Sequence, residues 1–217
     1  MGIWKRYEVE LQVTNELMAG IPKNPDLIGA WLESRQPTER QFEQRKENGE
    51  QMASIATLTE TVAEEVDSTG GEEEKAWLGF KKDDAGLYIE GSNVKAHLKD
   101  CGNQLQKILQ VKALRSKVAN RVYVEGERVH LGVQEPTDYY EHPVHVMTRQ
   151  GPRSALKRND YVDRPRLRFV LKVLDEPKPE VDEELLRSIF EYGGTHGIGA
   201  ERGIGYGRYT LEKLEEV

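Results

Sequence analysis

The chain has 217 residues, of which 32% are charged and 7% aromatic, and its formal net charge is −7 at pH 7. This length suits one sizeable core, or one core with an inserted subdomain, and no apolar run approaches the ~18 residues of a membrane-spanning helix. The single cysteine, Cys101, excludes an internal disulfide, and Met1–Arg6 lacks an apolar signal-peptide stretch, so we expect a cytoplasmic protein with no membrane contact.

The negative charge is concentrated in one segment. Residues 33–75 carry 12 acidic and 5 basic side chains, whereas the rest of the chain has 26 of each sign. Within the rest, residues 149–172 carry 8 basic and 2 acidic side chains, and residues 95–128 carry 8 and 3. Two basic stretches on a neutral body suit a groove that follows phosphates, and they suit solvated faces equally well.

A strand, an irregular connection and an acidic segment are expected in the first third of the chain. Apolar and polar residues alternate over 7–13, the period of a half-buried strand. Glycines and prolines between 15 and 35 indicate an irregular connection. Residues 36–76 are acidic and lack a persistent apolar face, so we expect an insertion after the first strand that is either helical or mobile.

Regular structure is expected again in the middle of the chain. A short strand at 87–89 leads into a helix for which Ser92 is a suitable N-cap. Residues 121–133 are expected to form an inserted β-hairpin, and residues 143–147 a further strand. The apolar face of the helix is expected to comprise Val94, Leu98, Cys101, Leu105, Ile108 and Leu109.

The C-terminal third contains a strand, a helix, a loop and a last strand. The alternation of apolar residues over 167–173 predicts the strand. Asp182 is expected to begin the helix, which we expect to end at Gly193–Gly194. A glycine-rich loop over 195–205 then precedes a strand at 206–211. With the insertion and the hairpin set aside, the order is strand, helix, strand, strand, helix, strand. This order predicts a single α+β domain over residues 1–217 with a ferredoxin-like (RRM-type) core.

The glycine-rich loop is the most informative feature of the sequence. Seven glycines lie between Gly193 and Gly207, with Arg202 and Arg208 near the end of the run. Glycine lets backbone amides approach a ligand closely, and arginine side chains fork onto phosphates. A Rossmann dinucleotide loop is excluded because a helix precedes the run and a strand follows it. A Walker loop is excluded because no Gly-Lys-Ser/Thr occurs there.

Three segments resemble the RAMP superfamily, the RRM-like proteins of CRISPR systems. The run Gly197–Tyr209 (GIGAERGIGYGRY) resembles the C-terminal loop of that family. Leu87–Lys99 is similar to the segment that enters the family's first helix, with Ala96 in place of the usual glycine. Ala155–Val162 resembles part of the family's backbone subunits. The acidic insertion has no counterpart in the resemblance.

The resemblance implies a subunit, without cofactor, that binds the guide RNA of a CRISPR effector complex and polymerises along it. Partners would be copies of itself, other effector subunits and, through base pairing, a target nucleic acid. A hairpin such as 122–131 would kink the bound RNA. The implied RNA-binding residues are Ser92, Lys95, Lys99, Gly197, Gly199, Arg202, Gly203, Gly205 and Arg208. The basic loop adds Arg149, Arg153, Lys157 and Arg158.

Two other functions stay open at this point. Relatives that process RNA use a histidine in metal-independent cleavage, which makes His97 and His196 candidates. Some type III relatives cut target RNA with an Asp after the first strand, where this chain has Asp26. A ferredoxin-like assembly protein that binds no nucleic acid is the third possibility. We expect no metal site, because the sequence has no Cys/His cluster. Candidates for base stacking, or for the core, are Tyr139, Tyr140, Tyr161, Tyr206 and Tyr209.

Overall fold

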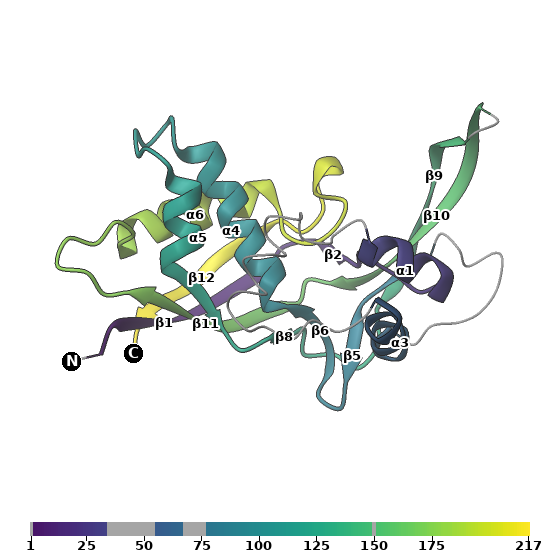
Figure 1. Ribbon diagram of the computed structural model, residues 1–217, viewed down its shortest axis with the longest axis horizontal. Helices are drawn as coiled ribbons and strands as arrows, with labels where there is room; N and C mark the ends of the chain where they lie inside the picture. Colours follow the sequence, from purple (N-terminus) through teal and green to yellow (C-terminus); the bar gives the residue numbers. More distant parts are fainter. Residues whose placement is uncertain (1, 34–54, 67–76, 149–150) are drawn as a thin grey trace. The chain divides into compact units, whose positions relative to one another are not determined.

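The computed structural model describes residues 2–33, 55–66, 77–148 and 151–217, and within these ranges the side chains of 25–26, 55–56 and 144–155 are not described. The chain is a mixed α+β protein (Figure 1). It divides into two compact units where the sequence led us to expect one domain. Unit 1 comprises Met1–Ala19, Asp84–Asp138 and Tyr161–Val217, and unit 2 comprises Gly20–Asp83 and Tyr139–Asp160.

Unit 1 contains an antiparallel sheet of four strands in the order β12-β1-β11-β7. Its strands are β1 (Trp4–Val13), β7 (Val122–Glu125), β11 (Arg166–Leu174) and β12 (Tyr209–Glu216). Helix α4 (Gly91–Leu105) lies between β1 and β7 in the sequence, and helix α6 (Glu183–His196) lies between β11 and β12. These six elements have the order strand, helix, strand, strand, helix, strand, but the second strand is β7, from the segment that the prediction set aside as a hairpin, whereas the predicted strand at 143–147 lies in β9 (Asp138–Thr148).

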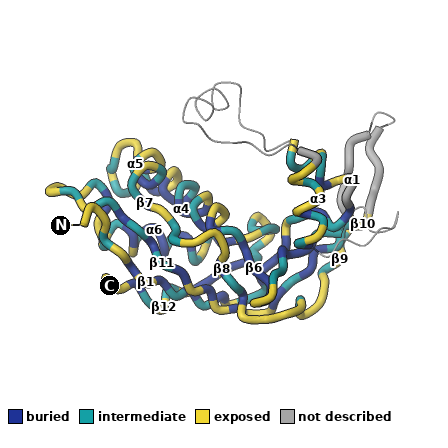
Figure 2. Tube along the Cα trace, turned by 60° about the horizontal axis from the view of Figure 1, so that its bottom comes forward, coloured by how far each residue is buried: buried dark blue, intermediate teal, exposed yellow. Residues whose placement is uncertain are grey.

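The core of unit 1 lies between this sheet and its helices. Helices α4, α5 (Leu114–Arg121) and α6 lie on one face of the sheet (Figure 1). Because successive side chains of a strand point to opposite faces, alternate residues of β1 and β11 are buried beneath the helices. Figure 2 shows these strands with their buried positions in dark blue. The buried residues are Tyr7, Val9, Leu11, Val13, Leu167, Phe169, Leu171 and Val173.

The two main helices differ at their ends from the prediction. Helix α4 ends at Leu105, so Ile108 is not on its buried face and is 72% exposed. Helix α6 does not end at Gly193–Gly194 and continues to His196. A Cβ at either glycine would collide with Tyr209 of β12. These glycines therefore allow the last turn of α6 to pack closely against β12.

The segment predicted as an inserted hairpin, 121–133, contains two strands with different partners. Strand β7 pairs with β11, whereas β8 (Arg128–His130) pairs with β6 (Gly86–Glu90). Each strand is therefore paired with a strand distant in the sequence and not with its neighbour across the turn. Val122 of β7 and Val129 of β8 are both buried. Elsewhere in unit 1, β2 (Glu16–Met18) pairs with the last residues of β10 (Gly151–Asp163).

Unit 2 contains helices α1 (Pro25–Glu33) and α3 (Ile55–Glu65), which pack through Ile28, Val62 and Val66. Its short strands are β3 (Ile21–Pro22), β4 (Trp77–Gly79) and β5 (Lys81–Asp83). Strand β4 pairs with β3 and, in parallel, with β10. Strand β9 (Asp138–Thr148) pairs with β10, where the sequence suggested a strand and a basic loop.

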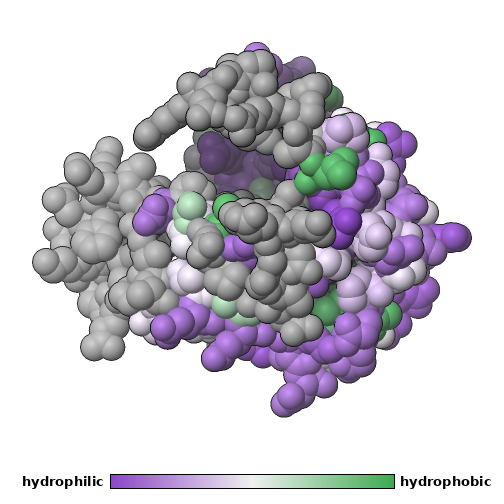
Figure 3. Space-filling view, turned by 90° about the vertical axis from the view of Figure 1, so that its right-hand side faces the viewer, coloured by the Kyte–Doolittle hydropathy of each residue, from purple (hydrophilic) through white to green (hydrophobic). Residues whose placement is uncertain are grey.

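The acidic insertion expected at 36–76 is described only at α3 and Val66, and its other residues lie outside the described part of the chain. Within the described ranges, no helix has the length and apolar character needed to cross a membrane. On the face shown in Figure 3, the coloured residues are mainly hydrophilic, and hydrophobic residues form small separate areas.

Candidate nucleic-acid interface

Asn15, just after β1, fixes the end of the glycine-rich loop. Its side-chain amide donates to the Gly205 carbonyl at 2.8 Å, and its carbonyl oxygen accepts from the Arg208 amide at 2.9 Å. The carbonyl of Arg208 in turn accepts from the backbone amide of Thr14 at 2.8 Å. The loop is therefore held to the residues that follow β1. The backbone of Arg208 is hydrogen-bonded at both its amide and its carbonyl, which fixes the position of its Cα.

The glycines of the loop have different roles. Gly197 and Gly207 have φ of +83° and +71°, and a Cβ on either would collide with a carbonyl oxygen across the loop. Both are thus required for the loop to close on itself. At Gly203, by contrast, a Cβ would have nothing within 4 Å. Gly203 lies in the short 3-10 turn Arg202–Ile204 and is exposed, so the space beside its Cα is open among the described residues.

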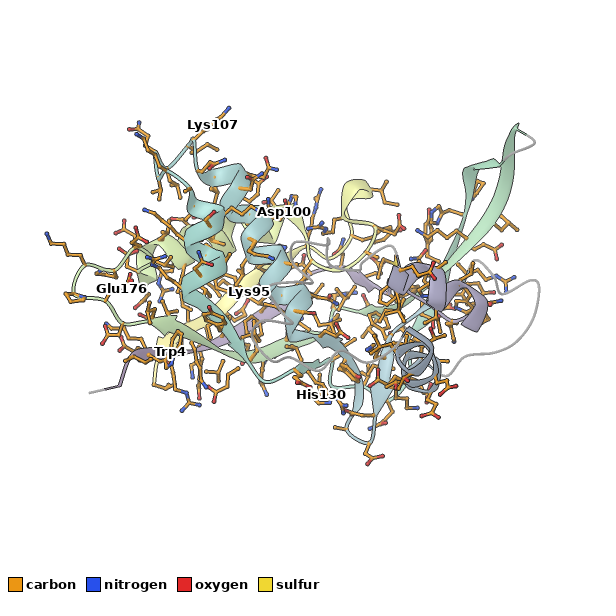
Figure 4. All side chains as sticks on the ribbon, viewed as in Figure 1. Trp4, Lys95, Asp100, Lys107, His130 and Glu176 are labelled. Carbon is orange, nitrogen blue, oxygen red and sulfur yellow. The ribbon has the colours of Figure 1, made fainter. Side chains whose placement is uncertain are left out.

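Asp100 on α4 connects the helix to the loop. Its Oδ2 lies 2.9 Å from Nε2 of His196 and 3.3 Å from Nη1 of Arg202. Burial alone would raise the pKa of Asp100, but the hydrogen bond from His196 and the charges of His196 and Arg202 hold that pKa below its usual value. An ionised Asp100 therefore keeps Arg202 beside the second half of α4. Figure 4 shows Asp100 and Lys95 along this helix.

The basic side chains predicted to bind RNA near Asp100 differ in how exposed they are and in which groups they contact. The Arg202 side chain is 35% exposed and Arg208 is exposed, while Lys99 is partly buried beside Asp100. Lys95 is engaged with β7, because its ammonium donates to the Val122 carbonyl and lies 3.9 Å from the Tyr123 ring centroid. Burial, followed by the charge of Lys99, lowers the pKa of Lys95 to about 8.

Ser92 is not the N-cap that the sequence suggested. Helix α4 starts at Gly91 with Glu90 in the capping position, and Ser92 is its second residue. The Ser92 hydroxyl donates to the Glu90 carboxylate at 3.0 Å. The exposed Ser92 thus lies at the N-terminal end of α4.

The buried His97 has a structural contact. It is 3% exposed, and its Nε2 lies 2.9 Å from the Tyr209 hydroxyl. Burial, helped by the charges of Arg202 and His196, lowers the pKa of His97 to about 3. A neutral, enclosed imidazole at neutral pH suits the packing of α4 on β12 better than proton transfer to a ligand.

The basic stretch at 149–172 is partly neutralised. Arg166 and Arg168 both contact Glu10 across the open face of the unit 1 sheet, at 3.0 and 2.9 Å. In unit 2, Arg158 contacts Glu141, and Lys157 is partly buried. The side chains of Asp26, Arg149 and Arg153 lie outside the described part of the chain.

Asn15 and Asp100 were missed by reasoning from the sequence. Asn15 is 190 residues from Gly205, and Asp100 is 102 residues from Arg202. Two features of the sequence could have pointed to these residues. Asn15 comes just after the first predicted strand, and Asp100 comes directly after the segment Leu87–Lys99. In the part of the chain that is described, no group of three or more His, Cys, Asp or Glu side chains could hold a metal ion.

The chain was compared with known proteins. No family model matches its sequence, and no curated protein matches it. Among solved structures, it is similar to a chain of the cryo-EM structure of Type III-B Cmr-beta bound to cognate target RNA, with a TM-score of 0.48 and 12% identity. The match covers 99% of this chain and 61% of the other, so the chain spans about three fifths of the length of the protein it matches.

Proposed function

We propose that this chain is an RNA-binding subunit of a CRISPR-type ribonucleoprotein, and that its C-terminal loop and α4 hold backbone phosphates of the guide RNA. The observation that carries the proposal is the contact of Arg202 with Asp100. It joins Gly197–Tyr209 to the residue that follows Leu87–Lys99, and the hydrogen bond of His97 with Tyr209 joins these two segments themselves, whose sequences separately resemble the RAMP superfamily.

The topology of unit 1 supports the same proposal. The sheet order β12-β1-β11-β7, with α4 and α6 on one face, supports a ferredoxin-like (RRM-type) core. The glycine-rich loop lies between its second helix and its last strand. We take the RRM-type core as the scaffold on which the loop is presented.

The proposed RNA contact lies on the loop and not on the open face of the sheet. RRM proteins stack bases on aromatic residues of the sheet. In this sheet, ion pairs occupy the outward face of β1 and β11: Glu10 contacts Arg166 and Arg168, and Glu125 contacts Arg6 at 2.9 Å. Pairing with a carboxylate lowers the attraction of these arginines for phosphates, and it does the same for Arg202 beside Asp100, so Arg208 is the stronger of the two loop arginines as a phosphate ligand.

The loop would act mechanically and electrostatically. Arginine forms short, charge-assisted hydrogen bonds with phosphate oxygens, and the open backbone at Gly203 can approach the same group. Such contacts fix the path of the RNA backbone and leave its bases free to pair with a target. We propose further that copies of the chain assemble side by side along the guide.

A titration of guide-length RNA into the purified protein tests this function. The Arg202→Ala/Arg208→Ala variant is expected to bind at least ~10-fold more weakly than wild type, because each lost charge-assisted contact costs roughly 1–2 kcal/mol. The matched control is Arg166→Ala/Arg168→Ala, which removes the same charge from the paired sheet face and is expected to bind within ~3-fold of wild type. Equal losses in both variants would reject the loop as the specific contact.

One observation favours a second function, metal-independent RNA cleavage. Nε2 of His196 lies 2.9 Å from Asp100 Oδ2 and 3.2 Å from Arg202 Nη1, so a carboxylate orients an imidazole that has a guanidinium beside it. In RNA cleavage, the imidazole could act as the general base and the guanidinium could bind the phosphate. End-labelled RNA incubated with a chelator decides between the functions. The RNA-holding function predicts intact RNA, whereas cleavage that wild type performs and His196→Ala does not would establish the nuclease.

A further inference from the structure

Trp77, Tyr139 and Arg158 form a cluster of aromatic rings and a cation in unit 2. The ring centroids of Trp77 and Tyr139 lie 5.8 Å apart with the planes tilted by 59°. The guanidinium carbon of Arg158 lies 5.7 Å from the Trp77 ring centroid and 5.3 Å from that of Tyr139. The three side chains come from β4, β9 and β10, so the cluster joins the β9–β10 hairpin to the short strand β4.

A buried carboxylate fixes the orientation of Trp77. Asp160, only 4% exposed, accepts the indole N–H of Trp77 and lies 3.4 Å from the Lys23 ammonium. The same ammonium lies 4.5 Å from the Trp77 ring centroid. Gly79 leaves the room for this pair, since a Cβ there would lie 3.0 Å from the Lys23 side chain. Trp77 is therefore held on its edge by Asp160 and on its face by Lys23.

Tyr139 is the exposed member of this rigid cluster. Its residue is 45% exposed, although its ring contacts both Trp77 and Arg158. The other tyrosines considered from the sequence are less suited to stacking: Tyr209 is 4% exposed, and Tyr140 is already stacked on His142 at 5.1 Å. Tyr139 therefore keeps part of its surface accessible while two side chains hold its ring.

We propose that Tyr139, supported by Trp77 and Arg158, is a stacking platform for a base of single-stranded RNA. Stacking of bases on aromatic side chains next to arginine is a general mode of single-strand binding. Trp77 and Arg158 hold the ring in place before binding, which lowers the entropy lost on stacking. Arg158 is itself paired with Glu141 and Lys23 with Asp160, so both cations act by fixing the aromatic rings. The platform rests on the proposed RNA-binding function and adds a contact that recognises bases, where the loop contacts phosphates.

Removal of bases from the ligand tests the platform directly. Two guide-length ligands are compared by fluorescence anisotropy, oligouridine and an oligomer of the same length in which abasic spacers replace the nucleosides. Tyr139→Leu keeps an apolar side chain against Trp77 but removes the ring, and Tyr139→Phe keeps the ring. Stacking predicts that Tyr139→Leu binds oligouridine about 5- to 100-fold more weakly and the abasic oligomer as wild type does. Tyr139→Phe is expected to bind both ligands as wild type does.

A second readout locates the base. Oligouridine that carries 5-iodouracil is expected to crosslink under ultraviolet light to the peptide that contains Tyr139 or to the one that contains Trp77, as mass spectrometry would show. Unchanged affinity of Tyr139→Leu for oligouridine, or an equal loss for both ligands, would overturn the platform. If RNA binding depends on Arg202 and Arg208 while Tyr139→Leu has no effect, the platform alone is rejected. If wild type binds neither ligand, the proposed function is rejected as well.

Discussion

At the scale of single residues, a hydrogen bond of His97 with Tyr209 joins α4 to β12. Because His97 is buried, its pKa falls from 6.5 to about 3, and the folded protein keeps the imidazole neutral well below neutral pH. The unfolded chain takes up a proton there near pH 6.5. Protons therefore favour the unfolded state over the interval between the two pKa values.

The pH dependence of stability follows with a definite sign. The contribution of His97 is fully present above pH 6.5 and is lost as the pH falls toward 3, by up to ~1.4 kcal/mol per pH unit. Urea unfolding measured across this interval is expected to show a shallower acid loss for His97→Gln than for wild type. If the free energy of unfolding of both proteins falls equally with decreasing pH, His97 is not a buried, neutral imidazole in the folded protein.

At the scale of elements, the loop after α6 depends on glycine at some positions only. Gly207 has φ of +71°, and a Cβ there would meet the Ile198 carbonyl, whose residue donates its amide to the Gly207 carbonyl at 2.8 Å. Gly203 has open space around it. The loop is therefore closed at Gly207 and open around Gly203, and of these two positions only Gly207 has a backbone conformation that favours glycine.

Alanine at these two glycines is expected to act differently. Gly207→Ala should lower the free energy of unfolding by about 1–3 kcal/mol or more, because strain and a collision with backbone add together. Gly203→Ala should change it by less than ~1 kcal/mol. Chemical denaturation gives the free energy of unfolding of both variants. Equal destabilisation would contradict the close approach of Gly207 to Ile198.

Local patterns predicted several elements correctly and others incorrectly. The alternation of apolar residues located β1 and β11, since one face of each strand is covered by helices. Gly193–Gly194 suggested a helix end, but these glycines make room for Tyr209, which is distant in the sequence. The turn at Glu125–Gly126 suggested a hairpin, but β7 and β8 pair with β11 and β6. In these cases tertiary contacts overrode a local signal.

The candidate site was predicted in its parts but not in its assembly. The sequence indicated the loop arginines and the α4 segment as two motifs. It did not indicate that Asp100 would join them or that Asn15 would fix Arg208, because these contacts span more than 100 residues of chain. The platform around Trp77 also depends on tertiary structure, since Lys23 and Asp160 are 137 residues apart.

At the scale of the whole molecule, net charge is a poor guide to the partner. The chain carries −7 overall, yet 12 of its 38 acidic residues lie within 33–75. Arg166 and Arg168 are paired with Glu10 across the sheet and Arg202 is paired with Asp100 at the loop, where Arg208 is exposed. What matters for a polyanionic partner is therefore the local charge at the loop.

The salt dependence of RNA binding tests the phosphate-holding loop most directly. Each phosphate contact to a single strand contributes ~0.7 to the slope of log affinity against log salt concentration. We predict salt-sensitive binding of guide-length RNA by wild type, and a slope shallower by about 1.4 for Arg202→Ala/Arg208→Ala. A slope equal to that of wild type in this variant, or no binding by wild type at low salt, would contradict the proposal, and the second result would favour an assembly protein without nucleic acid.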